Sequence, residues 1–309
     1  MCHLYGFFSS GQDTIKVEKD KYEDLLLSRG IFLETLFLEE KFDILMENYY
    51  DLEKEILTSS LRYLIFYGNL QNQMHDSRLS ITRSLINLLT TCRLFLDQSN
   101  HHINLIAGAK SKIKEEYQNL KTHEYESNFS YRILEELRNH AQHKGYPFHI
   151  ITFSTKLVDP EPGSLVVTSV IPKLSVKRLT GEGGFKQKVL DELSALGNDD
   201  IDLRPHIRSY IDSLQHIHNK IRKSTEDIVT SSINKLDMAY KLFSNENPDC
   251  ELGTLSLIEF KNPSNTNPKY GDHFSYNSIK RYKELRNKNL ANKSLVSQFV
   301  SSQIDLNSA

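Results

Sequence analysis

Apolar residues recur along most of this chain at the three- and four-residue spacing that is typical of amphipathic helices. The first such spacing begins at Lys21 and continues to Phe66, and the stretch 31–67 predicts either one long helix or two helices with a break near residues 48–50. Gly68 follows, and a glycine favours a helix end because it adopts the left-handed conformation at little cost. The N-terminal part of the chain therefore predicts unusually long helices.

The same spacing continues through the middle of the chain. It predicts a helix over residues 70–96, a connector at 97–102 and a polar helix at 106–122. The longest pattern begins near Asp202, a favourable N-cap residue, and runs to Phe243. Helices of this length bury an apolar stripe against other long helices, either within the chain or across a dimer.

The pattern changes after Pro147, where apolar and β-branched residues flank a turn signal. This change predicts a β-hairpin inside an insertion at 147–180. The predicted elements are, in order, a strand over 148–157, a turn at 160–163, a strand over 165–174 and a short helix over 185–196.

The two ends of the chain are less regular. Residues 1–19 are predicted to be irregular, 252–260 to be a strand and 276–291 to be a helix. The expected fold class is mainly α, a long-helix up-down bundle with an inserted or appended small β-hairpin or sheet. We expect the bundle to span residues 20–243 and a C-terminal extension to span 244–309.

Composition and charge narrow the class of protein. The 309 residues include 38 Lys and Arg against 40 Asp and Glu, and 39% are hydrophobic, which excludes a disordered chain and a basic protein that coats nucleic acid. Cys2, Cys92 and Cys250 lie far apart and suit a reducing cytoplasm better than a disulfide framework or a thiolate zinc site. Without a signal-peptide pattern or a membrane-length apolar run, we expect a cytoplasmic protein with no membrane partner.

One segment combines a guanidinium and an imidazole on one face of a predicted helix. This helix runs from Tyr131 to His143, between the capping residue Asn128 and a Gly-x-Pro stop. At about 100° per residue, its leucines share one face and its polar residues share another. Arg138 and His143 lie at the two ends of the polar arc, and a helix that ends at His143 lets the imidazole turn toward the guanidinium. The arc consists of Arg138, Gln142, Glu135, Asn139 and His143.

These groups suit the cleavage of a phosphodiester. A guanidinium forms bidentate hydrogen bonds to phosphate and stabilises the charge that develops on its oxygens. An imidazole takes the proton from a ribose 2′-OH and donates one to the leaving 5′-oxygen. We therefore predict that Arg138 holds the phosphate, that His143 is the acid and base, and that Asn139 orients either group or the phosphate. Because the 2′-OH is the nucleophile, no metal and no cofactor are expected.

The run Arg138-Asn139-His140-Ala141-Gln142-His143 resembles the signature of the HEPN superfamily (higher eukaryotes and prokaryotes nucleotide-binding). The resemblance maps Arg138, Asn139 and His143 onto the arginine, the polar residue and the histidine of that signature. It implies an all-α bundle, commonly dimeric, in which signature residues of two protomers meet in one cleft. Active members are metal-independent endoribonucleases of toxin–antitoxin, abortive-infection and CRISPR systems, and other members have lost catalysis. By this resemblance the expected partners are an RNA substrate, a second copy of the chain, and an antitoxin or another defence-system protein.

Two other pairs of histidines raise the question of a metal site. His101 and His102 are adjacent, and His216 and His218 are two residues apart, so neither pair shares a helix face. No third ligand accompanies either pair, and we predict no metal site.

The alternative interpretation is an interaction protein. In it, a catalytically silent HEPN-like chain, or an unrelated helical protein, dimerises through its long helix over 203–243. Ile211 and Leu214 would then lie in the interface, and the protein would associate without cutting RNA.

Overall fold

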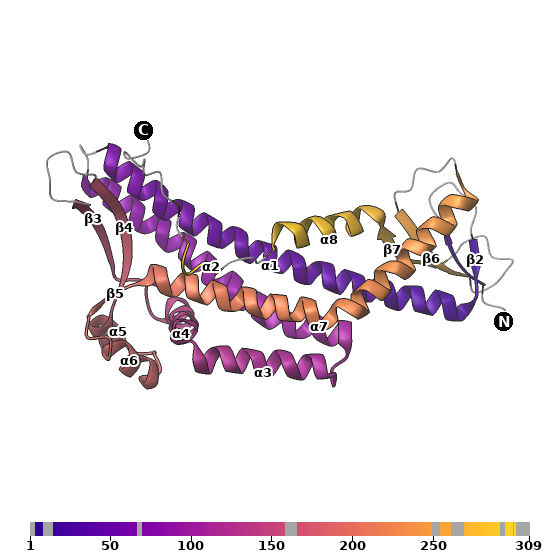
Figure 1. Cartoon of the computed structure of the whole chain (residues 1–309), viewed down its shortest axis with the longest axis horizontal. Coiled ribbons are helices and arrows are strands. Elements are labelled where there is room, and N and C mark those ends of the chain that lie inside the picture. Colours follow the sequence, from indigo (N-terminus) through magenta and orange to yellow (C-terminus); the bar gives the residue numbers. More distant parts are fainter. Residues whose placement is uncertain are drawn as a thin grey trace. The chain divides into compact units, whose positions relative to one another are not determined.

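The chain forms two compact units, each assembled from several segments. Unit 1 comprises residues 1–43, 95–118 and 220–290, and unit 2 comprises residues 44–94, 119–219 and 291–309 (Figure 1). Residues 244–290 thus belong to the same unit as the N-terminus. The computed structural model describes residues 4–8, 15–66, 70–157, 166–248, 254–260, 269–290, 294–298 and 300.

The described residues are mainly α-helical with two small antiparallel sheets, which confirms the predicted fold class. None of the described helices contains a stretch of 18 residues apolar enough to cross a membrane. The helices are α1 (Lys19–Ile65), α2 (Leu70–Ala107), α3 (Lys112–Ser127), α4 (Phe129–His143), α5 (Val176–Glu182), α6 (Gln187–Ser194), α7 (Leu203–Glu246) and α8 (Tyr276–Lys288). The strands are β1 (Leu4–Phe8), β2 (Ile15–Val17), β3 (Ile150–Leu157), β4 (Val166–Ser175), β5 (Asp200–Asp202), β6 (Thr254–Phe260) and β7 (Lys269–Ser275).

The first two helices are longer than the pattern of apolar residues indicates. α1 is continuous through residues 48–50, and Gly68 lies outside the described residues. The predicted connector at 97–102 is wrong, because α2 continues through it. The polar side chains of residues 97–102 have partners within the folded chain. The Ser99 hydroxyl donates to the Phe95 carbonyl at 2.6 Å, and His102 Nδ1 lies 2.7 Å from a carboxylate oxygen of Glu34 on α1. The helix ends instead at Gly108, which has a φ of 93°.

The hairpin predicted in unit 2 is confirmed. β3 and β4 pair antiparallel, with Ile150 opposite Lys173 and Leu157 opposite Val166. β4 also pairs with β5, which gives a three-stranded sheet in the order β3-β4-β5. The turn predicted at 160–163 lies outside the described residues.

The prediction that residues 1–19 are irregular is wrong for β1 and β2. These strands form a four-stranded antiparallel sheet in unit 1, in the order β2-β1-β6-β7. β6 confirms the strand predicted at 252–260 and α8 the helix predicted at 276–291, whereas β7 was not predicted. Tyr5 on β1 pairs with Glu259 on β6, so the partner of the first strand lies at the opposite end of the sequence. A local pattern of residues does not reveal such a pairing.

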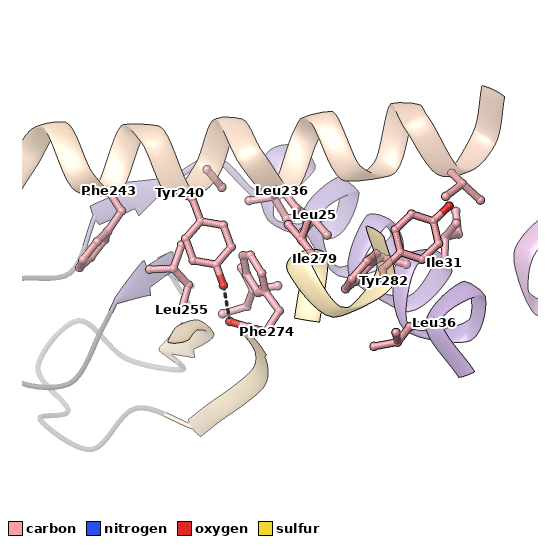
Figure 2. Close-up of a cluster of buried hydrophobic side chains, with 14 of the residues drawn as sticks. Leu25, Ile31, Leu36, Leu236, Tyr240, Phe243, Leu255, Phe274, Ile279 and Tyr282 are labelled. Carbon is pink, nitrogen blue, oxygen red and sulfur yellow. Dashed lines mark hydrogen bonds between the residues drawn. The ribbon is translucent and has the colours of Figure 1, made fainter. Parts of the chain in front are cut away.

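The core of unit 1 joins α7 and α8 to the start of α1 and to β6 and β7 (Figure 2). Leu236 and Phe243 project from α7 into this core and are fully buried. Between them, Tyr240 meets Phe274 of β7 edge to face, with ring centroids 5.0 Å apart. The Tyr240 hydroxyl donates a hydrogen bond of 2.7 Å to the Phe274 carbonyl, so this buried polar group is satisfied (Figure 2).

The N-terminal part of α7 is a core element of unit 2. Ile211 and Leu214 are both 0% exposed in the single chain. The expectation that these two residues form a dimer interface is therefore wrong. The apolar stripe of this helix is buried by other parts of the same chain, which a single amphipathic pattern does not identify.

Replacement of Leu236 by alanine tests the core of unit 1. A Leu236→Ala variant is expected to lose about 2–5 kcal/mol of unfolding free energy, because it removes apolar contacts and leaves a cavity. The exposed residue Met238 on the same helix is the matched control, and Met238→Ala should change stability by about 0.5 kcal/mol or less. Urea denaturation followed by circular dichroism measures both, and equal losses would contradict this assignment of the core.

Candidate functional site

α4 carries the three predicted site residues, and its start is held by Asn128. The Asn128 side-chain oxygen accepts hydrogen bonds from the backbone N–H groups of Ser130, at 2.9 Å, and Tyr131, at 3.3 Å. Its side-chain amide donates to the Ser213 hydroxyl of α7 at 2.8 Å. An N-cap of this kind stabilises a helix by about 1 kcal/mol. The predicted capping residue therefore also anchors α4 on its neighbour.

α4 has one buried face and one face toward solvent. Leu134 and Leu137 are at most 1% exposed and belong to the core. Arg138 and Asn139 are partly exposed, and His143, in the last turn, is exposed. All three predicted site residues thus lie on the accessible side of the helix. No hydrogen bond joins Arg138 to His143 within the described part of the chain.

The guanidinium of Arg138 is incompletely satisfied. Its Nη1 donates to the Gln142 side-chain oxygen at 2.7 Å. Its Nε is shielded from solvent and has no hydrogen-bond partner among the described residues. A buried donor without an acceptor costs about 1–3 kcal/mol, so it marks a place where a ligand oxygen would be stabilising. The Nε–Nη2 edge of an arginine is also an edge that binds two oxygens of a phosphate side by side.

The acidic residue of the arc does not neutralise Arg138. Glu135 accepts a hydrogen bond from the Tyr210 hydroxyl, and its other oxygen lies 3.5 Å from Arg93 Nη1. Burial and the charge of Glu135 raise the pKa of Tyr210, so the hydroxyl keeps its proton and donates it. Glu135 is thus a structural acceptor, and the charge of Arg138 remains available to an anion.

A second group of titratable side chains lies at the end of α4. His140 Nε2 lies 2.9 Å from Glu182 Oε2, and His149 Nε2 lies 3.4 Å from the same oxygen. The His140 side chain is fully buried, whereas that of Glu182 is 41% exposed. Gly145 borders the pair: a Cβ at this position would lie 3.2 Å from His140 Nε2 and 3.3 Å from Glu182 Oε2. A larger residue at 145 would therefore crowd the group.

His140, His149 and Glu182 are the one group of three residues in the described structure whose donor atoms lie close enough to share a metal ion. Two imidazoles and a carboxylate form a donor set that Zn²⁺ accepts. However, the backbone N–H of Ser175 donates to His149 Nδ1 at 3.0 Å, which places the ring proton on Nε2. His149 then presents an N–H group, not a lone pair, to Glu182. In this state His149 is hydrogen-bonded to Ser175 and Glu182, His140 lies close to the same carboxylate, and a metal would have to displace the bond from Ser175.

The spacing of residues along the sequence does not reveal this group. His140 is 1% exposed and packs on the buried side of α4. His149 and Glu182 lie nine and 42 residues further along the chain, a spacing that matches no ligand motif. The histidines that suggested a metal have other partners, since His102 lies beside Glu34 and His216 beside Glu124.

The buried His140 predicts a loss of stability in acid. Burial lowers its pKa below the ordinary 6.5, His149 adds to this effect, and the Glu182 carboxylate opposes it. As the pH falls below 6.5, the unfolded chain therefore binds a proton that the folded chain does not, and stability decreases until the lower folded pKa is passed. Half-buried His206, whose pKa is also lowered by desolvation, acts in the same direction.

Thermal unfolding between about pH 7.5 and about pH 5 measures this loss. A His140→Gln variant should show a shallower decrease in Tm over this range, whereas a variant of the exposed His143, His143→Gln, should follow the wild type. A wild-type Tm that rises as the pH falls through this range would contradict the direction of the His140 shift.

The hydrogen bond from Ser175 to His149 predicts weak metal binding. Added Zn²⁺ should leave the Tm of the protein unchanged, and EDTA should not lower it. Differential scanning fluorimetry tests both statements. A Tm that rises with zinc concentration in the wild type, and not in a His140→Gln variant, would show that the group is a metal site.

No family model, curated protein or solved structure matches this chain. Its function must therefore be inferred from its own side chains. On α4, two features carry side chains that could take part in a reaction. They are the exposed arc with Arg138 and His143, and the buried histidine His140.

Proposed function

We propose that this protein is a metal-independent endoribonuclease of the HEPN type, acting in anti-phage defence or in a toxin–antitoxin pair. The observation that carries the proposal is the state of Arg138. Its guanidinium has a buried donor without an acceptor, and the nearest acidic residue of the arc, Glu135, is bound elsewhere. A phosphate oxygen would satisfy that donor and provide the missing negative charge.

In the proposed reaction, the ribose 2′-oxygen attacks the adjacent phosphorus and the bond to the 5′-oxygen breaks. The products are a 2′,3′-cyclic phosphate and a free 5′-hydroxyl. The proposed enzyme is a dimer in which the two copies of His143 share one cleft. His143 of one copy accepts the proton of the 2′-hydroxyl, and His143 of the other copy protonates the leaving oxygen. Arg138 stabilises the charge on the phosphate oxygens, and Asn139 orients the phosphate.

The positions of these residues favour such a role. Asn139 and His143 follow Arg138 by one and five residues on a helix whose opposite face is buried, so the backbone that carries them is well ordered by packing. His143 lies in the last helical turn and is exposed, so its ring is free to reorient toward a bound phosphate. The near-neutral net charge of −2 suits a protein that contacts few phosphates at a time.

Cleavage of labelled single-stranded RNA by the purified full-length protein in EDTA tests this proposal. We expect cleavage that leaves a 2′,3′-cyclic phosphate and no cleavage of an RNA with 2′-deoxyribose at the scissile position. Arg138→Ala and His143→Ala should each lower the rate by about a hundredfold or more, since one removes the anion-stabilising group and the other the acid and base.

Two variants outside the arc are matched controls. Arg281 and His123 are exposed and lie on α8 and α3, so Arg281→Ala and His123→Ala should cut RNA at the wild-type rate. The proposal fails if the wild type cuts no RNA, if the deoxy substrate is cut, if EDTA abolishes activity, or if the two site variants remain active.

A further inference from the structure

Unit 2 contains a cavity of about 760 Å³, and none of its lining residues belongs to the arc on α4. A volume of this size accommodates a whole small organic molecule. α1, β4, β5, the start of α7 and the segment after α8 contribute its walls. The lining residues are Met46, Tyr49, Tyr50, Glu53, Ile56, Leu57, Ser60, Thr168, Ser169, Asp202, Arg204, Pro205, Arg208, Leu295, Gln298 and Val300.

Much of the lining is apolar or aromatic. Met46, Ile56 and Leu295 provide aliphatic and thioether surface, and Tyr49 and Tyr50 provide two rings. Tyr50 is 59% exposed although it is a large aromatic side chain. Such surface is stabilised when an apolar body covers it.

The carboxylates of the cavity already have partners. Glu53 accepts two hydrogen bonds from Arg208, at 2.8 and 2.9 Å, and one from the Tyr49 hydroxyl at 3.0 Å. Burial and the charge of Glu53 raise the pKa of Tyr49, so this hydroxyl remains a donor. Asp202 accepts from the backbone N–H, Nε and Nη2 of Arg204, the last at 2.7 Å. The acceptor capacity of both carboxylates is thus largely used.

The donors of the cavity are not all used. Nη1 of Arg204 has no hydrogen-bond partner among the described residues, and the Arg204 side chain is 26% exposed. The Ser60 hydroxyl, by contrast, accepts from the Val170 N–H at 3.0 Å and donates to the Ile56 carbonyl at 2.8 Å. Arg204 therefore provides the cavity with a cationic donor that is not fully used, and such a donor prefers an anionic acceptor.

From this balance we infer that the cavity binds an amphipathic organic anion, with one carboxylate, sulfonate or phosphate head on Arg204 and an aromatic or aliphatic body against the tyrosines and aliphatic side chains. The two arginines and two carboxylates cancel in net charge, so the apolar body supplies most of the affinity and the head supplies orientation. This inference is independent of the proposed nuclease activity.

Anilinonaphthalene sulfonate, a fluorescent aromatic anion, is a suitable probe. The native full-length protein should enhance its fluorescence with a micromolar Kd, under conditions where near-ultraviolet circular dichroism shows intact packing. Decanoate should displace the probe, and decanol, which lacks the anionic head, should displace it at least about tenfold less well.

Two variants and one control locate the site. Arg204→Gln should weaken probe binding by about tenfold, and Ser169→Trp, which fills the cavity, should abolish it. Arg281→Gln is the matched control, because Arg281 also pairs with a nearby carboxylate but lies on α8, outside the cavity.

The inference is overturned if the native protein does not bind the probe, if all three variants bind it equally, or if decanol competes as well as decanoate. Should Arg204→Gln not fold, Ser169→Trp and the pair of competitors still decide between these outcomes.

Discussion

The structure depends on the burial of one face of α7 along its length. This helix of 44 residues derives most of its stability from the removal of its apolar stripe from solvent. Near the start of the helix, Ile207, Ile211 and Leu214 are at most 2% exposed in unit 2, and near its end Leu236 and Phe243 are fully buried in unit 1. Each unit thus uses a different part of one stripe as a core element.

The packing of α4 follows from this arrangement. Asn128 caps α4 and donates to Ser213 of α7, and the Tyr210 hydroxyl of α7 binds Glu135 of α4. These contacts orient α4 so that its leucines are buried and Arg138 and His143 are accessible. The Glu135 carboxylate next to Arg138 is hydrogen-bonded to Tyr210 of α7, and none of the described acidic residues forms an ion pair with the arginine. Structural and chemical roles are therefore divided between the two faces of one short helix.

The three polar sites of unit 2 differ in the hydrogen-bond partners of their side chains. In the group of His140, Glu182 and His149, the Ser175 N–H places the proton of His149 on Nε2, and His140 Nε2 lies 2.9 Å from Glu182 Oε2. Arg138 has a shielded Nε without an acceptor among the described residues, whereas the Arg204 side chain is 26% exposed. Charged pairs that are complete stabilise the fold or are neutral, whereas an unsatisfied donor lowers stability unless a ligand completes it. Arg138 and Arg204 are the two positions at which we propose that anions bind.

Local periodicity, together with turn and cap chemistry, was enough to predict the mainly helical class, the long helices, the β3–β4 hairpin and the cap at Asn128. It also placed Arg138, Asn139 and His143 on one side of α4. Three features became clear only from the tertiary structure. α2 continues through 97–102, β1 pairs with β6, and Ile211 and Leu214 are core residues. Those outcomes depend on partners far away in the chain. The His140 group and the Arg204 cavity belong to the same class, since hydrogen bonds between distant segments, and not local spacing, decide which donors are satisfied.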